Sequence, residues 1–241
     1  MLELSMKSVF ITGANRGLGK GFVEYFLKQN YKVFAGTRNP GAFDAHLLEN
    51  PNLYVVKIDV TDEDSIFSAY SEVKKITKNL SCLINNAGLN KDSATDNHKE
   101  LVCCLNDLKK EALLKMFEVN TIAPLMLTKI FMPLLNDNPS FVINISSARG
   151  SYNDENLNTS ANYGYRASKA ALNMMTFCSV FDLPPNVKTF SVHPGGVKTD
   201  MNPTGTDLPM EQAEKIMSIT RNWKEEFNGR FLRYDGTFYP L

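Results

Sequence analysis

The sequence predicts an α/β fold in which a doubly wound parallel sheet carries helices on both faces. Short apolar runs rich in Val, Ile and Phe alternate along the chain with segments of helical periodicity. A glycine-rich turn follows the first apolar run and opens the first helix. The 241 residues suffice for one sizeable core, and neither a linker nor an internal repeat divides them. We therefore expect a single domain over residues 1–241.

The first half of the chain contains four expected strands, at residues 8–12, 32–36, 53–58 and 82–85. Apolar residues dominate each of them, as in strands that are buried on both faces. Residues 17–29 place Phe22, Tyr25 and Phe26 at helical spacing, and residues 65–77 predict another helix. Strands that return through helices in this way imply parallel pairing.

The second half continues the pattern. A long helix over residues 105–135, kinked near Pro124, precedes a strand at 141–146, and a helix at 163–181 precedes a strand at 187–192. Residues 194–209 are rich in Pro, Gly, Thr and Asp, which predicts an irregular segment. A short helix over 211–219 follows. We expect residues 201–219 to form a loop on the substrate side, with apolar side chains that act as a lid.

Composition excludes several classes of function. The 26 basic residues balance the 26 acidic ones, so no overall field recruits nucleic acid or an anionic membrane. The first residues lack an export signal, and the most apolar stretch, 121–135, is interrupted by Lys129 and two prolines. A cytoplasmic protein is expected. The three histidines show no metal-ligand spacing, so no metal site is predicted. The cysteines are expected to be reduced thiols: Cys82, Cys103, Cys104 and Cys178.

Tyr165 and Lys169 form the most informative local pair. They are four residues apart on an expected helix, so their Cβ atoms lie roughly 5–6 Å apart on one face. A neighbouring ammonium favours the phenolate and lowers the pKa of a tyrosine toward neutrality. Such a tyrosine can donate or accept a proton in catalysis. Tyr163 has no lysine four residues later, and we expect it to be a packing or loop residue.

The glycine-rich turn predicts a site for a phosphate-bearing cofactor. Gly13, Gly17 and Gly19 follow a strand and open a helix, where a pyrophosphate can approach the backbone amides. By themselves three glycines also fit an ordinary strand-to-helix turn. The second strand ends without a carboxylate, and Arg38 stands there instead, which with Arg16 favours a 2′-phosphate. NADPH/NADP+ is therefore the predicted cofactor, although two solvated surface arginines remain the alternative.

With these two segments, four further motifs make the chain resemble the short-chain dehydrogenases/reductases over nearly its whole length. The motifs are Asp59-Val60, Asn85-Asn86-Ala87-Gly88, the segment 143–147 ending in Ser147, and Pro194-Gly195 with Val197 and Thr199. Segments 13–19, 165–173 and 193–201 also resemble the sniffer-like and C-factor-like carbonyl reductases within that family. The resemblance implies a single-domain Rossmann-type fold, with a homodimer through the helices that begin near 105 and 163.

The resemblance also implies a role for each motif residue. The implied catalytic residues are Asn120, Ser147, Tyr165 and Lys169. The implied cofactor contacts are Gly13, Asn15, Arg16, Gly17, Leu18, Gly19, Arg38, Asp59, Val60, Asn86, Ala87, Gly88, Tyr165, Lys169, Pro194, Gly195, Val197 and Thr199.

Two features of the serine segment leave alternatives open. Ser146 and Ser147 point to opposite faces of an expected strand, and the family pattern selects Ser147. The interval between Ser147 and Tyr165 is longer than in many family members, which predicts an extended loop over residues 152–162 at the substrate mouth.

The predicted function is reduction of a small, largely apolar carbonyl compound, an aldehyde, ketone, diketone or quinone, with Tyr165 as proton donor. An NADPH-binding sensor or scaffold with little turnover is the alternative. A nucleotide-sugar epimerase is disfavoured, because few residues follow Thr199 to build a sugar-nucleotide domain.

Overall fold

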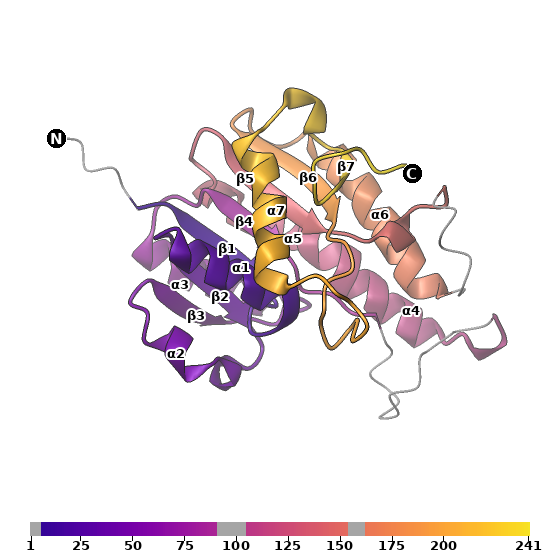
Figure 1. Cartoon of the computed structure of the whole chain (residues 1–241), viewed down its shortest axis with the longest axis horizontal. Coiled ribbons are helices and arrows are strands. Elements are labelled where there is room, and N and C mark those ends of the chain that lie inside the picture. The colour runs from indigo at the N-terminus through magenta and orange to yellow at the C-terminus, as the bar shows by residue number, and fades with distance from the viewer. Residues whose placement is uncertain (1–5, 91–104, 154–161) are drawn as a thin grey trace.

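The computed structural model describes residues 6–90, 105–153 and 162–241, and Figure 1 shows their arrangement. The described residues form a parallel sheet with the strand order β3-β2-β1-β4-β5-β6-β7. The strands are β1 (Ser8–Thr12), β2 (Lys32–Thr37), β3 (Leu53–Lys57), β4 (Cys82–Asn85), β5 (Ser140–Ile145), β6 (Val187–His193) and β7 (Phe231–Arg233).

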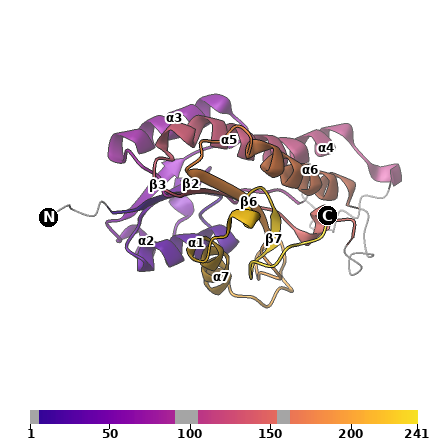
Figure 2. The ribbon, with the colours of Figure 1, turned by 90° about the horizontal axis from the view of Figure 1, so that it is seen from above.

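Helices cover both faces of this sheet, which confirms the predicted fold class. Figure 2 shows α1, α2 and α7 on one side of the sheet and α3, α4, α5 and α6 on the other. The helices are α1 (Gly17–Lys28), α2 (Ala45–Leu48), α3 (Glu63–Ile76), α4 (Lys110–Phe117), α5 (Ala123–Phe131), α6 (Tyr163–Ser179) and α7 (Pro209–Arg221).

Strand alternation divides the apolar side chains between two cores. Val9 and Ile11 of β1 face α1 and α7, where they join a cluster that includes Phe22. Phe10, between them in sequence, faces the opposite side and packs with Phe131 of α5 at a ring-centroid distance of 4.5 Å. β1 is thus apolar on both faces.

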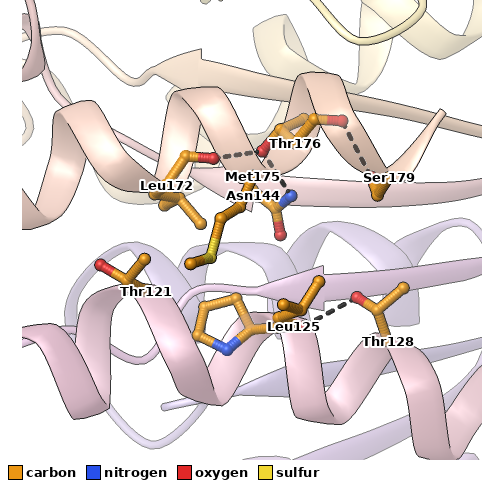
Figure 3. A pocket seen from close by; sticks show the side chains of 9 residues that line it. Thr121, Leu125, Thr128, Asn144, Leu172, Met175, Thr176 and Ser179 are labelled. Carbon is orange, nitrogen blue, oxygen red and sulfur yellow. Dashed lines mark hydrogen bonds between the residues drawn. The ribbon is translucent and has the colours of Figure 1, made fainter. Parts of the chain in front are cut away.

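Beneath α6 the sheet face is polar. Asn85 of β4 donates to the Asn144 side chain of β5 at 2.8 Å, and Asn144 donates to Thr176 Oγ1 of α6 at 2.9 Å. Figure 3 shows this contact beside a cavity of about 10 Å³ between α5 and α6. A polar cavity of that size has room for about one water molecule. The hydrogen bonds between Asn85, Asn144 and Thr176 therefore help to fix α6, which carries the two predicted catalytic residues Tyr165 and Lys169.

The long helix expected over residues 105–135 is interrupted, which corrects that prediction. Short 3₁₀ turns occupy Leu105–Asp107 and Met132–Leu134, and a π-helical turn over Glu118–Ile122 separates α4 from α5. Pro124 has no N–H to donate to the carbonyl of Asn120, and its ring crowds that carbonyl, so the helix widens just before the proline. The expected kink is a π turn that contains Asn120.

Candidate active site

The predicted site residues share one edge of the sheet. In a parallel sheet the carboxyl ends of all strands lie together, and this edge is where ligands bind in open α/β folds. The predicted residues follow the strands in this order: Gly13 to Gly19 after β1, Arg38 after β2, Asp59 and Val60 after β3, Asn86 to Gly88 after β4, Ser147 after β5, and Pro194 to Thr199 after β6.

Ser147 and Tyr165 meet at this edge. Ser147 caps a 3₁₀ turn, and its Oγ accepts a hydrogen bond from the Arg149 N–H at 3.2 Å. The same hydroxyl also acts on the buried side chain of Tyr165, in the first turn of α6, where it favours a lower pKa. Ser146 lies elsewhere, buried with its Oγ 3.5 Å from the Lys169 carbonyl oxygen, and Tyr163 is 42% exposed. Ser147 is therefore the serine that lies beside Tyr165. Ser146 and Tyr163 take no part in this pair.

Burial dominates the electrostatics of Tyr165 and Lys169. It raises the pKa of Tyr165, against the opposing effects of the Ser147 hydroxyl and the Arg149 charge. Burial also lowers the pKa of Lys169 to about 8. The expectation of a lowered tyrosine pKa is thus wrong. Lys169 Nζ donates to the Ile145 carbonyl at 2.7 Å and lies 5.8 Å from the centre of the Tyr165 ring.

Asn120 connects three parts of the site. It is fully buried in the π turn, and its side-chain oxygen accepts from the Leu89 N–H at 2.7 Å. Its Nδ2 donates to the Leu89 carbonyl at 2.8 Å and to Ser168 Oγ at 3.0 Å. A Cβ atom placed on Gly88 would lie 3.5 Å from Asn120 Oδ1 and 3.8 Å from Lys169 Nζ. The side chains of Asn120 and Lys169 therefore both lie beside Gly88.

The glycine turn is shaped to admit an anion. Gly17 has a φ of 54°, which disfavours other residues, and a Cβ on Gly19 would overlap the Gly13 carbonyl oxygen. The first turn of α1 contains no acidic residue, and the side chain of Arg16 makes no capping hydrogen bond. The positive end of the helix is thus not neutralised locally, as a site for a pyrophosphate requires. These residues fit the predicted dinucleotide.

Thr12, the last residue of β1 and the first of the glycine-turn motif, holds this part of the site together through a hydroxyl whose role was not predicted. Its Oγ1 accepts from the N–H groups of Asn86 and Ala87 at 3.0 Å each. Asn86 Nδ2 donates back to the carbonyls of Thr12 at 2.9 Å and Gly13 at 3.1 Å. The segment after β4 is thereby fixed against the glycine turn. A threonine at the end of the first strand was the available signal.

The two arginines predicted to bind a 2′-phosphate have different surroundings. Arg38 is exposed at the end of β2, and its charge helps to lower the pKa of Asp59, for which the Thr61 N–H hydrogen bond is the largest cause. Arg16 instead forms an ion pair with Asp200, with Nη1 2.7 Å from Oδ2. No local pattern in the sequence relates Asp200 to Arg16, because the two residues are 184 positions apart.

The segment after β6 is held by turns. Gly195 has a φ of 82°, and the N–H of Gly196 donates to Asp207 Oδ2 at 2.9 Å. Thr199 and Asn202 exchange backbone hydrogen bonds of 3.2 and 3.0 Å. Residues 201–208 are irregular, as predicted, and the expected helix over 211–219 is α7, which is longer at both ends.

The described residues bear on the predictions about metal sites, membrane spans and cysteines. Among the described residues there is no cluster of three or more side chains suited to a metal, and none of the described helices has the length and apolarity to cross a membrane. Cys82 is buried and Cys178 exposed. Cys103, Cys104 and residues 154–161 of the extended loop lie outside the described residues.

Comparison with known proteins agrees with this geometry. Residues 7–207 match the family model of the short chain dehydrogenases. A carbonyl reductase from chicken fatty liver, solved with NADPH bound, is 32% identical over 99% of this chain and 100% of its own, with a TM-score of 0.86. The carbonyl reductase Sniffer of Drosophila melanogaster is 31% identical over 98% of this chain and 100% of its own, with a TM-score of 0.85.

Relatives known by sequence point to the same class. An uncharacterized oxidoreductase of Schizosaccharomyces pombe is 31% identical over 98% of both chains. Human 17-beta-hydroxysteroid dehydrogenase type 2 is 33% identical over 89% of this chain, which spans 53% of that protein. With its sheet order, its site and these matches, the chain belongs to the short-chain dehydrogenase family and is an oxidoreductase of that family.

Proposed function

We propose that this protein reduces carbonyl compounds to alcohols with NADPH. The observation that carries the proposal is that buried Tyr165 interacts with Ser147 at the carboxyl edge of the sheet, with Lys169 Nζ 5.8 Å from the centre of its ring. This group lies at the same sheet edge as the glycine turn. The chicken and Drosophila carbonyl reductases, similar over nearly the whole chain, support the choice of reaction.

NADPH, when bound, supplies a hydride from its nicotinamide ring to the carbonyl carbon of the substrate. Negative charge then grows on the substrate oxygen, which the hydroxyls of Ser147 and Tyr165 can hydrogen-bond. Tyr165 donates its proton to that oxygen, and its raised pKa keeps the phenol protonated at neutral pH. Lys169 would hold the nicotinamide ribose. We assign Asn120 the positioning of a water that restores the proton through Lys169.

Arg38 supports NADPH over NADH. The end of β2 carries Thr37, which is buried, and no carboxylate that would repel a 2′-phosphate. The exposed guanidinium of Arg38 can bind such a phosphate with two parallel hydrogen bonds. In a cytoplasmic setting, which we also propose, this cofactor favours reduction over oxidation.

An apolar substrate is favoured by the segment that follows Thr199. Met201 and Leu208 are 43% and 53% exposed in this segment, and Met210 lies in the first turn of α7, which follows it. Flexible apolar side chains of this kind can close over a small molecule and adapt to its shape. We propose small aldehydes, ketones, diketones and quinones as substrates, selected by fit.

The test is NADPH consumption with a panel of these compounds, with phosphorylated and sugar carbonyls included. Tyr165→Phe keeps the ring and removes the proton, so turnover should fall roughly 10²–10⁴-fold while NADPH still binds. Tyr163→Phe, on the same helix but exposed, is the matched control and should keep normal turnover. Normal turnover by Tyr165→Phe, or a phosphorylated carbonyl as the best substrate, would contradict the proposal.

We also propose that the protein forms a homodimer through the outer surface of α4, α5 and α6. Large apolar side chains are exposed on these helices and on the π turn and helix end that adjoin them. They are Leu114, Ile122, Leu125, Met174, Phe177 and Phe181. Exposed apolar patches of this kind mark protein interfaces.

A further inference from the structure

The ion pair of Arg16 with Asp200 joins two segments that the proposed cofactor must contact together. Arg16 is the N-cap residue of α1, in the glycine turn, and Asp200 directly follows Thr199. Arg16 Nη1 lies 2.7 Å from Asp200 Oδ2, and the two side chains are 69% and 75% exposed. The residue predicted to bind a phosphate thus already binds a carboxylate supplied by the protein.

The backbone on both sides fixes this pairing. The N–H of Asn202 donates to the carbonyl of Thr199 at 3.0 Å and to its Oγ1 at 3.1 Å, and Asn202 Nδ2 donates to the Val197 carbonyl at 3.2 Å. Asp200 therefore sits within a closed turn. That turn lies against the glycine segment, because a Cβ on Gly17 would be 3.1 Å from Thr199 Cγ2. The carboxylate is presented to Arg16 from a defined position.

A guanidinium binds a carboxylate and a phosphate through the same N–H groups, so the two anions compete for one arginine. We propose that Asp200 is a specificity-determining residue, which competes with the 2′-phosphate of NADPH for Arg16 and so reduces the preference for NADPH over NADH. This inference rests on the proposed function. Asp200 leaves Arg38 free to bind the phosphate, so it weakens the preference without abolishing it.

Because the ion pair is exposed, the effect is small. Exposed pairs of this kind contribute little to stability, and breaking one corresponds to a change in affinity of about two- to fivefold. NADH carries no 2′-phosphate and does not require Arg16 to leave Asp200. The two cofactors therefore respond differently to removal of the carboxylate charge.

Isothermal titration calorimetry of NADPH and NADH against Asp200→Asn, Arg16→Ala and the double variant tests the proposal without any turnover. Asp200→Asn should bind NADPH about two- to fivefold more tightly and NADH as the wild type does. In the Arg16→Ala background the same substitution should change nothing. Glu211→Gln, an equal change of charge on the exposed first turn of α7, is the control for long-range electrostatics and should leave both affinities unchanged.

Three results would overturn the competition. If Asp200→Asn bound NADPH with the same affinity as the wild type, and the wild type preferred NADPH over NADH, the competition would be excluded and the proposed function would stand. Weaker binding of both cofactors by Asp200→Asn would show that the carboxylate holds the turn in place. A wild type without preference for NADPH would remove the cofactor assignment and the competition together.

Discussion

The buried ammonium of Lys169 lowers the stability of the folded protein at neutral pH. Its pKa is about 8 in the folded protein, against 10.5 for an ordinary lysine, because burial penalises the ammonium. Below pH 8 the unfolded chain therefore binds this proton more tightly than the folded one, and the group destabilises the fold. That penalty declines as the pH rises from about 8 to 10.5.

Replacement of Lys169 by methionine should reverse this penalty while abolishing turnover. The gain in the free energy of unfolding, relative to wild type, should be roughly 2 kcal/mol larger at pH 7 than at pH 10. Packing changes that do not depend on the charge of Lys169 are the same at both pH values and cancel from the comparison. Urea unfolding at pH 7 and 10 measures the difference, with the exposed Lys198→Met as control. A difference that does not change with pH would contradict a buried ammonium.

Arg38 is expected to provide most of the selectivity for NADPH. Loss of a charge-assisted hydrogen bond costs about 1.5–3 kcal/mol, so Arg38→Ala should weaken NADPH binding by roughly one to two powers of ten. NADH binding should not change. Arg230 is exposed just before β7, at the opposite edge of the sheet, and Arg230→Ala is the control. An equal loss of affinity for both cofactors in calorimetric titration would show that Arg38 does not contact the 2′-phosphate.

At the scale of elements, the hydrogen bond from Asn144 to Thr176 helps to hold α6 on the sheet. Thr176→Val keeps the shape but removes the acceptor, which leaves the buried Asn144 amide without its partner. An unsatisfied buried donor costs about 1–3 kcal/mol, and the free energy of unfolding should fall by that amount. Thr176→Ser keeps the hydroxyl and is the control in urea titrations. Equal stability of the valine variant and wild type would show that a water in the neighbouring cavity replaces the hydroxyl.

The sequence predicted those strands and helices that have a clear local pattern of apolar residues. The six strands β1 to β6 each had an apolar run, and the carboxyl-edge location of Ser147 and Gly13 followed from parallel pairing. The π turn at Asn120 was missed because its cause, a missing hydrogen bond at Pro124, is also compatible with a simple kink. β7 has three residues, too few for an alternation to be recognised.

The sequence predicted the site only in part. Tyr165 and Lys169 share a helix face, so their spacing in the sequence indicated that they act together. The contact of Arg16 with Asp200 depends on a turn that closes 184 residues later. The raised pKa of Tyr165 depends on how deeply the tertiary structure buries it, which spacing does not reveal.

At the scale of the whole molecule, the proposed dimer can be separated from the fold. Phe177 of α6 is 42% exposed. Its ring packs edge to face against that of Phe181, with 5.6 Å between the ring centroids. Phe177→Glu places a charge in the proposed interface, so sedimentation velocity should show a monomer with an unchanged circular dichroism spectrum. Phe67→Glu, on α3 at 60% exposure, is the control and should remain a dimer. A monomeric wild type would remove the interface from consideration.

The strand order also has a consequence for the protein as it leaves the ribosome. β1 lies between β2 and β4, so one edge of this central strand stays unpaired until residues 82–85 have been synthesised. The nascent chain carries the glycine turn from the start, yet Tyr165 and Thr199 emerge only much later. Unpaired strand edges invite association with other chains, and ligands stabilise only a site that has formed. During most of its synthesis this chain therefore gains no stability from its cofactor.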